Sequence, residues 1–298
     1  MLNPVKPIKR RRWQLMPKLL LVLGLVLALL DAGTRYYYTS KYKDAKVLVL
    51  GHAGSGFLSP LNPFNPLPSN SKASILKALE KHGADGVEVD VQLSKDGVPI
   101  LYHDVTLASL TERQDTIDNL NAAEVAGLAY QGGFFYDLFH DEKIITLEEL
   151  LRHVSGYEAV PYLHIDLRNH DPARHTYYAR TLLGLLRRYK YPLEKLAFIS
   201  PNPDFLEAFR QAEPKATLIL DVSGNYDQAM QEIEAHGLQG ICANGRDMTP
   251  ERMRQARERG LQVVLFGGKS HSRIARMLEM RPDAIQVNNV AAARRMLD

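Results

Sequence analysis

Two carboxylates and a histidine within one short stretch carry the strongest chemical signal in this sequence. Residues 86–104 read GVEVDVQLSKDGVPILYHD, which is typical of a strand, a tight Asp-Gly turn and a second short strand. Because successive side chains of a strand point to opposite faces, Glu88 and Asp90 share one face, with their Cα atoms roughly 7 Å apart. Valines fill the other face, and the second strand ends on His103 and Asp104. The hairpin therefore combines an acidic face with an imidazole at its end.

The negative charges of two neighbouring carboxylates on a strand require compensation. They repel each other, and they are costly to bury unless a positive group lies between them. Ligands that are all oxygen favour a hard divalent cation, Ca²⁺ or Mg²⁺. A solvated face on which each carboxylate pairs with a lysine or an arginine explains the same pattern. These residues alone leave both interpretations open.

Further polar side chains follow other apolar runs. The first run ends in GHAG, which places His52 at the end of a strand. The run YLHIDLR puts His164, Asp166 and Arg168 at alternate positions on one strand face. In a barrel of parallel strands, sites form at the C-terminal ends of the strands. We therefore expect these side chains to lie on one rim with the carboxylates and the imidazole of the hairpin.

Apolar runs alternate with helical patterns along most of the chain. This alternation implies parallel pairing, and eight units over about 250 residues match a (β/α)8 barrel. The count requires the segment VPILYHD to be a hairpin arm rather than a ninth barrel strand, because parallel neighbours need a long crossover. The expected barrel strands are residues 47–51, 86–91, 162–167, 196–200, 217–222, 240–243, 261–266 and 284–287.

The segments between these runs divide into helices and loops. Helical patterns are found at residues 71–83, 176–190, 202–213, 227–237, 249–260 and 272–281. Two long irregular stretches, 53–70 and 128–145, are expected to shape a site, as long loops in a compact barrel usually do. Residues 57–67 of the first stretch are apolar, so they either contact acyl chains or fold over the barrel rim.

Composition argues against a nucleic-acid partner. Apolar residues make up 45% of the 298 positions and charged residues 24%, which is ordinary for a globular protein. The net charge of +3 comes from the first 45 residues, which hold nine of the 37 basic and two of the 34 acidic residues. The 28 basic and 32 acidic residues that remain give residues 46–298 a net negative charge. The single cysteine, Cys242, excludes an intrachain disulfide and lies in an apolar run typical of a core.

A basic arm followed by an apolar run distinguishes the N-terminus. The segment VKPIKRRRWQLMPK carries six positive charges and no negative charge, and LLLVLGLVLALL follows at residues 19–30. Twelve apolar residues resemble the core of a signal sequence, whereas a membrane span needs about 20. A retained anchor, a cleaved signal and a buried helix of a soluble protein all remain open. The first two keep the basic arm in the cytoplasm and export the remainder.

The motifs together resemble the glycerophosphodiester phosphodiesterase family. Its members carry HRG after strand one, E-x-D-V-x-x-(T/S)-K-D-G-x-x-(V/I)-x-x-H-D in the hairpin, and E-x-K on strand three. This sequence has HAG at 52–54, EVDVQLSKDGVPILYHD at 88–104 and DLR at 166–168. The resemblance covers residues 46–298, and after residue 200 it is carried only by the strand–helix rhythm.

The resemblance implies a fold, a reaction and a cofactor. The fold is of the α/β class, a (β/α)8 TIM barrel with a β-hairpin extension after strand two and an N-terminal hydrophobic helix. The reaction is hydrolysis of glycerophosphodiesters to glycerol 3-phosphate and an alcohol. Glu88, Asp90 and Asp166 are implied to bind one divalent cation, Ca²⁺ or Mg²⁺. His52 and His103 are implied to be the general acid and base, a role that suits imidazole because it titrates near neutral pH.

Four positions depart from the family pattern. Ala53 stands in place of arginine, Asp166 in place of glutamate and Arg168 in place of lysine, and SNS at 69–71 replaces ENT. The shorter Asp166 is expected to draw the metal towards strand three. Without an arginine at position 53, we expect Arg168 or Lys269 to bind the substrate phosphate, although arginine and lysine present different geometry.

Two other functions remain open from the sequence. One is a lipid-directed phospholipase of the lysophospholipase D or phosphoinositide type, and the other is a catalytically silent phospholipid-binding barrel. Retention of the acid/base pair argues against the silent barrel, because binding alone does not need it. We expect a small-molecule phosphodiester as substrate, a membrane contacted through the N-terminal segment, and no nucleic acid. The oligomeric state is open.

The expected organisation is a short N-terminal part followed by one catalytic domain. Residues 1–45 are interpreted as the basic arm, the hydrophobic signal or anchor segment and a spacer. Residues 46–298 are interpreted as the phosphodiesterase barrel. The barrel is expected outside the cytoplasm, either anchored to the membrane or, if the N-terminal segment is cleaved, secreted or periplasmic.

Overall fold

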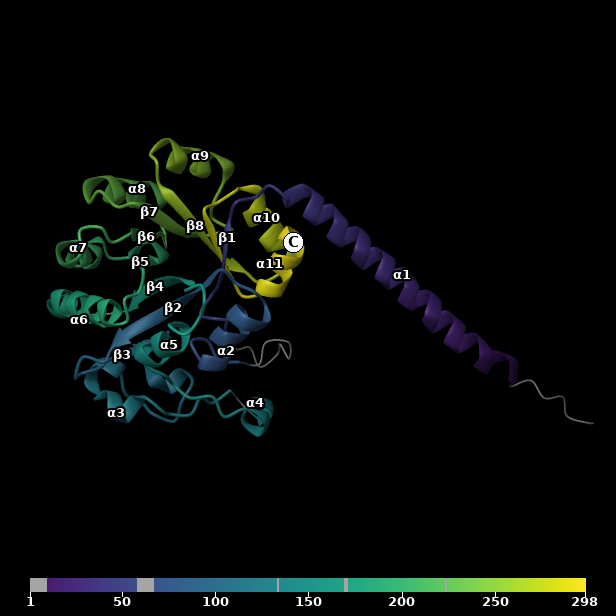
Figure 1. Ribbon diagram of the computed structural model, residues 1–298, viewed down its shortest axis with the longest axis horizontal. Helices are drawn as coiled ribbons and strands as arrows, with labels where there is room; N and C mark the ends of the chain where they lie inside the picture. The colour runs from purple at the N-terminus through teal and green to yellow at the C-terminus, as the bar shows by residue number, and fades with distance from the viewer. Residues whose placement is uncertain (1–9, 58–66, 133, 169–170, 223) are drawn as a thin grey trace, which may run out of the picture. The chain divides into compact units, whose positions relative to one another are not determined.

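A closed barrel of eight parallel strands forms the main body of the protein (Figure 1). The computed structural model describes residues 10–57, 67–132, 134–168, 171–222 and 224–298. These residues belong to two compact units, one of residues up to Asp44 together with Arg295–Asp298, and one of Ala45–Arg294. The barrel lies within the second unit.

Each barrel strand pairs in parallel with the next, and β1 pairs with both β9 and β2, which closes the barrel. The strands are β1 (Leu48–Gly51), β2 (Gly86–Leu93), β4 (Tyr162–Arg168), β5 (Leu196–Ser200), β6 (Leu218–Val222), β7 (Gly240–Asn244), β8 (Gln262–Gly268) and β9 (Ala284–Val287). The eight strands expected from the sequence are all confirmed to within two residues. They were recognisable because a strand buried on both faces is an almost continuous apolar run.

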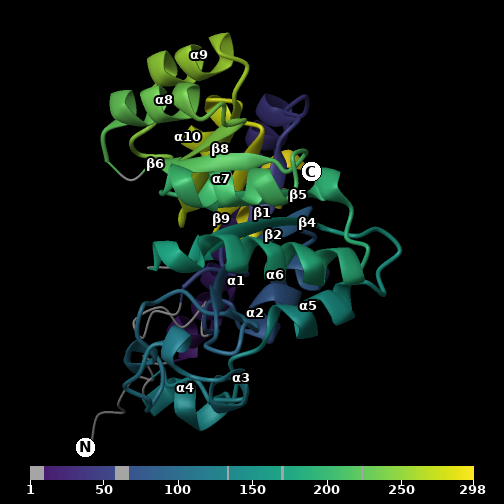
Figure 2. The same ribbon diagram turned by 90° about the vertical axis from the view of Figure 1, so that its left-hand side faces the viewer.

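Helices connect the strands, and α6 to α9 lie outside the strands that they join (Figures 1 and 2). The longer helices are α5 (Leu147–Val154), α6 (His175–Arg188), α7 (Pro203–Ala212), α8 (Tyr226–Ala235), α9 (Pro250–Glu258), α10 (His271–Glu279) and α11 (Val290–Leu297). The short ones are α2 (Lys72–Leu76), continued by a π-turn at Lys77–Lys81, α3 (Ala122–Val125) and α4 (Phe134–Phe139). Single 3₁₀ turns occur at Leu107–Ser109, Ile117–Asn119, Pro172–Arg174 and Leu193–Lys195. The six helical patterns are confirmed, whereas α5 and α11 were not anticipated.

The barrel interior is apolar at depth and polar towards the C-terminal ends of the strands. Its apolar cluster consists of Leu50, Ala197, Ile199, Ile219, Cys242, Val264 and Ala284. Cys242 is 3% exposed, so the expectation that it belongs to the core is confirmed. Because residues i and i+2 of a strand share a face, the positions that follow this layer also point inward, and several of them are acidic.

The hairpin after β2 has the expected form. Strand β3 (Pro99–Leu101) pairs antiparallel with β2, and Val91 lies opposite Leu101. The turn depends on Gly97, whose φ of 86° is in the left-handed region and whose Cα lies close to Tyr177. A side-chain carbon at this position would meet the Tyr177 hydroxyl at 2.0 Å. The segment is therefore an extension and not a ninth barrel strand.

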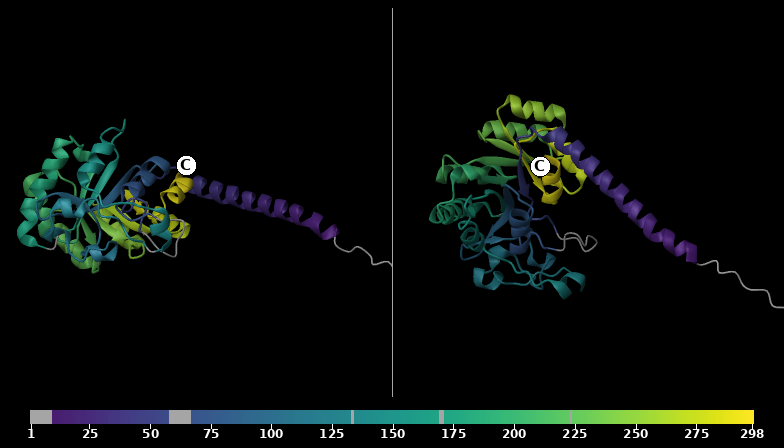
Figure 3. Two further views of the ribbon diagram at one scale, coloured as in Figure 1. Left: turned by 90° about the horizontal axis from the view of Figure 1, so that it is seen from below. Right: turned by 45° about the vertical axis from the view of Figure 1, so that its right-hand side comes forward.

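Helix α1 (Arg10–Tyr42) forms the N-terminal hydrophobic helix, and it is continuous in both views of Figure 3. Its segment Pro17–Tyr42 spans 26 residues, and the most apolar 18-residue window of that segment has a mean hydropathy of 1.8 and is not buried. By length and composition alone, this segment is long enough to cross a membrane. The helix therefore extends well beyond the twelve-residue apolar run seen in the sequence.

Candidate active site

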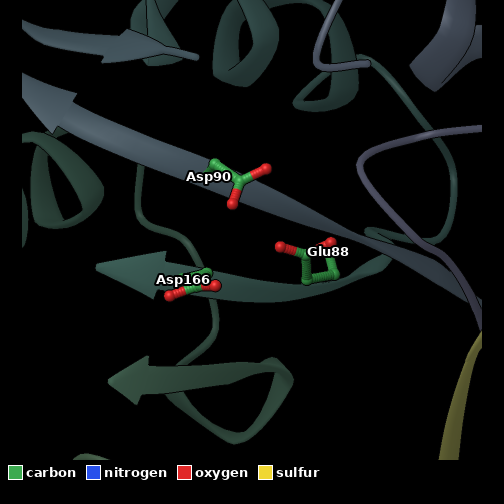
Figure 4. A group of neighbouring side chains, drawn as sticks. All are labelled: Glu88, Asp90 and Asp166. Atoms are coloured by element: carbon green, nitrogen blue, oxygen red, sulfur yellow. The ribbon is translucent and has the colours of Figure 1, made fainter. Parts of the chain in front are cut away.

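Three carboxylates converge near the C-terminal ends of β2 and β4 (Figure 4). Glu88 and Asp90 project from β2, and Asp166 projects from β4. Asp90 and Asp166 are direct partners in the parallel register of these two strands. One oxygen from each of the three residues lies within 4.8 Å of the others. This arrangement suits a single cation with oxygen ligands.

The surroundings of these carboxylates favour a bound cation. Glu88 and Asp90 are 3% and 1% exposed. Burial raises the pKa of Glu88 well above its usual value, and the charges of Asp90 and Asp166 raise it further. Burial also raises the pKa of Asp166 to about 7, although Arg168 opposes this shift. The Oδ1 atom of Asp166 is buried and accepts no hydrogen bond from the described part of the chain. The three residues therefore fit a hard divalent ion, which would compensate their charge.

Arg168 lies among the carboxylates. Its Nη2 atom is 2.8 Å from Asp90 Oδ1 and 2.6 Å from Asp166 Oδ2. The side chain is 32% exposed, although its Nε atom is buried and donates no hydrogen bond within the described part of the chain. The two interpretations of the acidic strand were a cation site and a solvated face paired with basic residues. Arg168 does pair with two of the carboxylates, as the second requires. The face is nevertheless buried rather than solvated, as the first requires.

His52 is oriented by a residue from the far end of the chain. Its Nδ1 atom lies 3.0 Å from Asn288 Oδ1, and its Nε2 atom lies 4.0 Å from Glu88 Oε2. Burial lowers the pKa of His52, and the hydrogen bond to Asn288 opposes this effect. The imidazole is therefore mainly neutral near pH 7. Neither Asn288 nor this contact was anticipated, although the sequence QVNN after the last strand offered a polar residue at the rim.

His103 is oriented by its neighbour in the sequence. Its Nδ1 atom lies 2.7 Å from Asp104 Oδ1, and its side chain is 33% exposed. The ring of Phe57 lies between the two histidines, with its centroid 5.1 Å from that of His52 and 4.9 Å from that of His103. Residues 58–66, which follow in the proposed acyl-contacting loop, lie outside the described residues.

Asn70 orients the central carboxylate. Its Nδ2 atom donates to Asp90 Oδ2 at 2.8 Å, and its Oδ1 atom accepts from the Asp90 backbone N–H at 3.0 Å. The residue has a φ of 62°, a left-handed conformation that asparagine tolerates better than most residues. Asn70 is the residue that SNS shares with ENT, and in this chain it holds the Asp90 carboxylate in place.

Ala53 is fully buried, and its backbone N–H donates to Glu88 Oε2 at 2.7 Å. Lys269, by contrast, is exposed after β8 and forms no ion pair with any described residue. Of the two cations expected to bind phosphate, only Arg168 contacts the carboxylates.

Two further inward-facing residues complete the description, His164 on β4 and Asp221 on β6. His164, two positions before Asp166, is buried beside Gln286, with 3.3 Å between His164 Nδ1 and Gln286 Nε2. Burial lowers the pKa of His164 to about 4, so it is a neutral core residue rather than part of the rim. Asp221 at the end of β6 was not anticipated. Its Oδ1 atom is buried without a hydrogen-bond partner in the described ranges, and burial raises its pKa to about 6.

Asp221→Asn is expected to stabilise the cation-free protein at alkaline pH. The folded pKa of about 6 exceeds the usual 3.8, so the folded protein binds more protons than the unfolded chain between these values. Its contribution to stability is therefore lost as the pH rises through this window. The substitution should add on the order of 2 kcal/mol at pH 8 and much less at pH 4. Urea unfolding in EDTA at both pH values, with the exposed Asp141→Asn as control, measures this. An equal effect at the two pH values would contradict it.

Comparison with known proteins assigns the chain to a family. A sequence model of the glycerophosphoryl diester phosphodiesterase family matches residues 59–292. The chain therefore belongs to the glycerophosphoryl diester phosphodiesterase family, as the sequence motifs implied.

Two curated relatives show local similarity. A glycerophosphodiester phosphodiesterase of Caldanaerobacter subterraneus is 34% identical over 105 residues, which are 35% of this chain and 39% of the relative. The glycerophosphocholine phosphodiesterase of Mus musculus is 37% identical over 87 residues, which are 29% of this chain and 13% of the relative. The chain thus matches less than two fifths of the length of either relative.

Solved structures share the fold over nearly the whole barrel. A phosphodiesterase of Oleispira antarctica, in complex with the product sn-glycerol-3-phosphate, has a TM-score of 0.72 and 22% identity, covering 84% of this chain and 96% of that one. A glycerophosphodiester phosphodiesterase of Agrobacterium tumefaciens has a TM-score of 0.66 and 22% identity, covering 83% and 98%. This similarity confirms the TIM barrel.

Proposed function

We propose that this protein hydrolyses glycerophosphodiesters to glycerol 3-phosphate and an alcohol, using one divalent cation and a pair of histidines. The observation that carries the proposal is the buried carboxylate cluster, with oxygens within 4.8 Å of one another, beside His52. Family membership and the product-bound relative support the substrate class.

The two histidines have separate environments that suit different roles. His52 is mainly neutral because burial lowers its pKa, so it is the better base for a proton of the attacking hydroxyl. His103 is more exposed, and its Nδ1 atom lies 2.7 Å from Asp104 Oδ1, which fixes the orientation of the ring. His103 is therefore proposed as the acid that protonates the leaving oxygen. The fixed orientation of both imidazole rings argues against a catalytically silent phospholipid-binding barrel, because binding alone does not need an oriented acid or base.

Glu88, Asp90 and Asp166 would hold the cation, either Ca²⁺ or Mg²⁺, because they offer only oxygen ligands. When bound, the ion would supply positive charge beside a non-bridging oxygen of the phosphodiester. Arg168 is permanently charged and partly exposed, so it is proposed to contact the same phosphate from the rim. Lys269 is proposed only as a peripheral contact, because it is exposed and lies after β8.

Hydrolysis of a substrate panel tests the proposed function. Glycerophosphocholine, glycerophosphoethanolamine and glycerophosphoglycerol should each release glycerol 3-phosphate, and EDTA should abolish the release. A lysophospholipid in the same assay distinguishes the lipid-directed alternative. Release of a phosphorylated headgroup, or no turnover with any compound after addition of Ca²⁺ and Mg²⁺, would refute the proposal.

The barrel is proposed to lie outside the cytoplasm, attached through α1 or released after cleavage. The apolar segment Pro17–Tyr42 and the preceding basic arm support this orientation, because positive residues flanking a span remain cytoplasmic. Residues 1–45 would then be the anchor part and residues 46–298 the catalytic domain. An alkaline phosphatase fused after residue 45 should be active in a bacterial host. Activity only with a cytoplasmic reporter at the same position would contradict this topology.

A further inference from the structure

A cavity rich in arginine lies at the C-terminal rim of the barrel. It has a volume of about 300 Å³ and is formed by the end of β7 and the residues that follow it, the end of β8, and α10. Three guanidinium side chains line it, those of Arg246, Arg273 and Arg276. Aspartate and glutamate are absent from its described lining.

The three arginines are available for a ligand. None of them forms a side-chain hydrogen bond or an ion pair with the described residues. Some other arginines of this chain are paired: Arg254 contacts Glu258 at 2.7 Å, and Arg188 contacts Glu148 at 2.9 Å. Three like charges around one cavity repel one another, so an anion bound between them would be stabilised. Guanidinium groups match phosphate oxygens in a two-pronged geometry.

The backbone around the cavity is well fixed. The Gly245 N–H donates to the Phe266 carbonyl at 3.0 Å, and the Arg246 N–H donates to Asn244 Oδ1 at 3.0 Å. A side-chain carbon at Gly245 would lie 2.6 Å from Met277 Cγ, so this loop packs directly on α10. The cavity therefore exists before a ligand binds, which lowers the entropy lost on binding.

Phe266 connects the cavity to the active site. Phe266 is one of the residues that line the cavity, and its ring centroid is 5.8 Å from that of His52. The arginine-lined cavity and the proposed catalytic imidazole of His52 therefore have Phe266 as a common neighbour.

We propose that this cavity is a second anion subsite, which binds another phosphate of the same substrate molecule. The inference rests on the proposed function and names the substrate class more narrowly. The preferred substrates are glycerophosphodiesters that carry a second phosphate group. A suitable probe is bis(glycerophospho)glycerol, because its symmetry lets the second phosphate lie on either side of the reacting one. Glycerophosphoglycerol is the matched compound with a single phosphate.

Steady-state kinetics of the full chain in detergent test the subsite. The wild-type kcat/KM should be at least tenfold higher for bis(glycerophospho)glycerol than for glycerophosphoglycerol at low ionic strength. Arg246→Gln and Arg276→Gln should each reduce this preference at least threefold. The control Arg180→Gln removes an equal charge from the exposed face of α6 and should leave the preference unchanged. No preference in the wild type, or an equal reduction in the control, would overturn the inference.

Calorimetry separates this inference from the proposed function. Binding of bis(glycerophospho)glycerol in EDTA needs no turnover, and both cavity variants should weaken it at least threefold. If neither compound is hydrolysed but this pattern holds, the proposed reaction fails and the subsite stands. Unchanged binding in the variants would overturn the subsite. Inorganic phosphate binding as tightly as bis(glycerophospho)glycerol would show a site for free phosphate and would overturn the substrate assignment.

Discussion

Replacing His52 or His103 with alanine is expected to lower kcat by about 10²–10⁴, the usual contribution of a positioned acid or base. Both rings are oriented through Nδ1, His52 by Asn288 and His103 by Asp104, so each presents Nε2 for proton transfer. The two residues act on the same phosphodiester, so the double variant should lose less than the product of the two separate losses. Rates of glycerol 3-phosphate release under saturating substrate measure these effects.

The pH profile separates the roles of the two histidines. If His52 is the base, His52→Ala should remove the fall in kcat/KM at acidic pH, whereas His103→Ala should retain that fall. His82, at the end of the turn after α2, provides a control, because it precedes β2 at the opposite end of the barrel. His82→Ala should keep the wild-type rate. A His52 or His103 variant within a few-fold of wild type would exclude that residue from the mechanism.

The strands were predictable because a buried strand has a locally apolar composition. Each barrel strand is a mainly apolar run that ends at a glycine, a proline or a polar residue. The alternation of strands with helices then allows only a few topologies for the fold. Helix α5 was missed because its eight residues follow a long loop, although Thr146 and Glu149 form a capping box that signals its start. Helix α11 follows the last strand after only two residues and offered no comparable signal.

The candidate site was predictable only where its residues share a motif. Glu88, Asp90 and His103 fall within one hairpin, whereas Asn288 reaches His52 from 236 positions away. The register that sets Asp90 beside Asp166 depends on how β2 and β4 align, and local patterns do not specify that alignment. Asp221 and the arginine-lined cavity come together only when the barrel closes.

Removal of the divalent cation is expected to lower turnover at least about 100-fold, and Ca²⁺ or Mg²⁺ should restore it. Asp90→Asn should weaken cation binding by about 10–100-fold, because it removes a charge from the centre of the cluster but keeps the shape of the side chain. Titration calorimetry of the chelated protein measures the affinity without any turnover. The exposed Asp141→Asn should bind as the wild type does. A chelated enzyme with full activity would show that the carboxylates are structural.

Arg168→Met is expected to change two quantities in opposite directions. In the wild type, Nη2 of Arg168 contacts Asp90 and Asp166 at 2.8 and 2.6 Å, so a cation must compete with a permanent positive charge for these oxygens. Methionine removes that competition, and cation affinity should rise at least about tenfold. It also removes the proposed phosphate contact, so KM at saturating cation should rise by at least about tenfold. Arg168→Lys keeps the charge without the forked geometry. Its cation affinity and its KM should therefore lie between those of the wild type and those of Arg168→Met. Weaker cation binding in Arg168→Met would mean that Arg168 holds the carboxylates in position, and an unchanged KM would mean that the phosphate is bound without it.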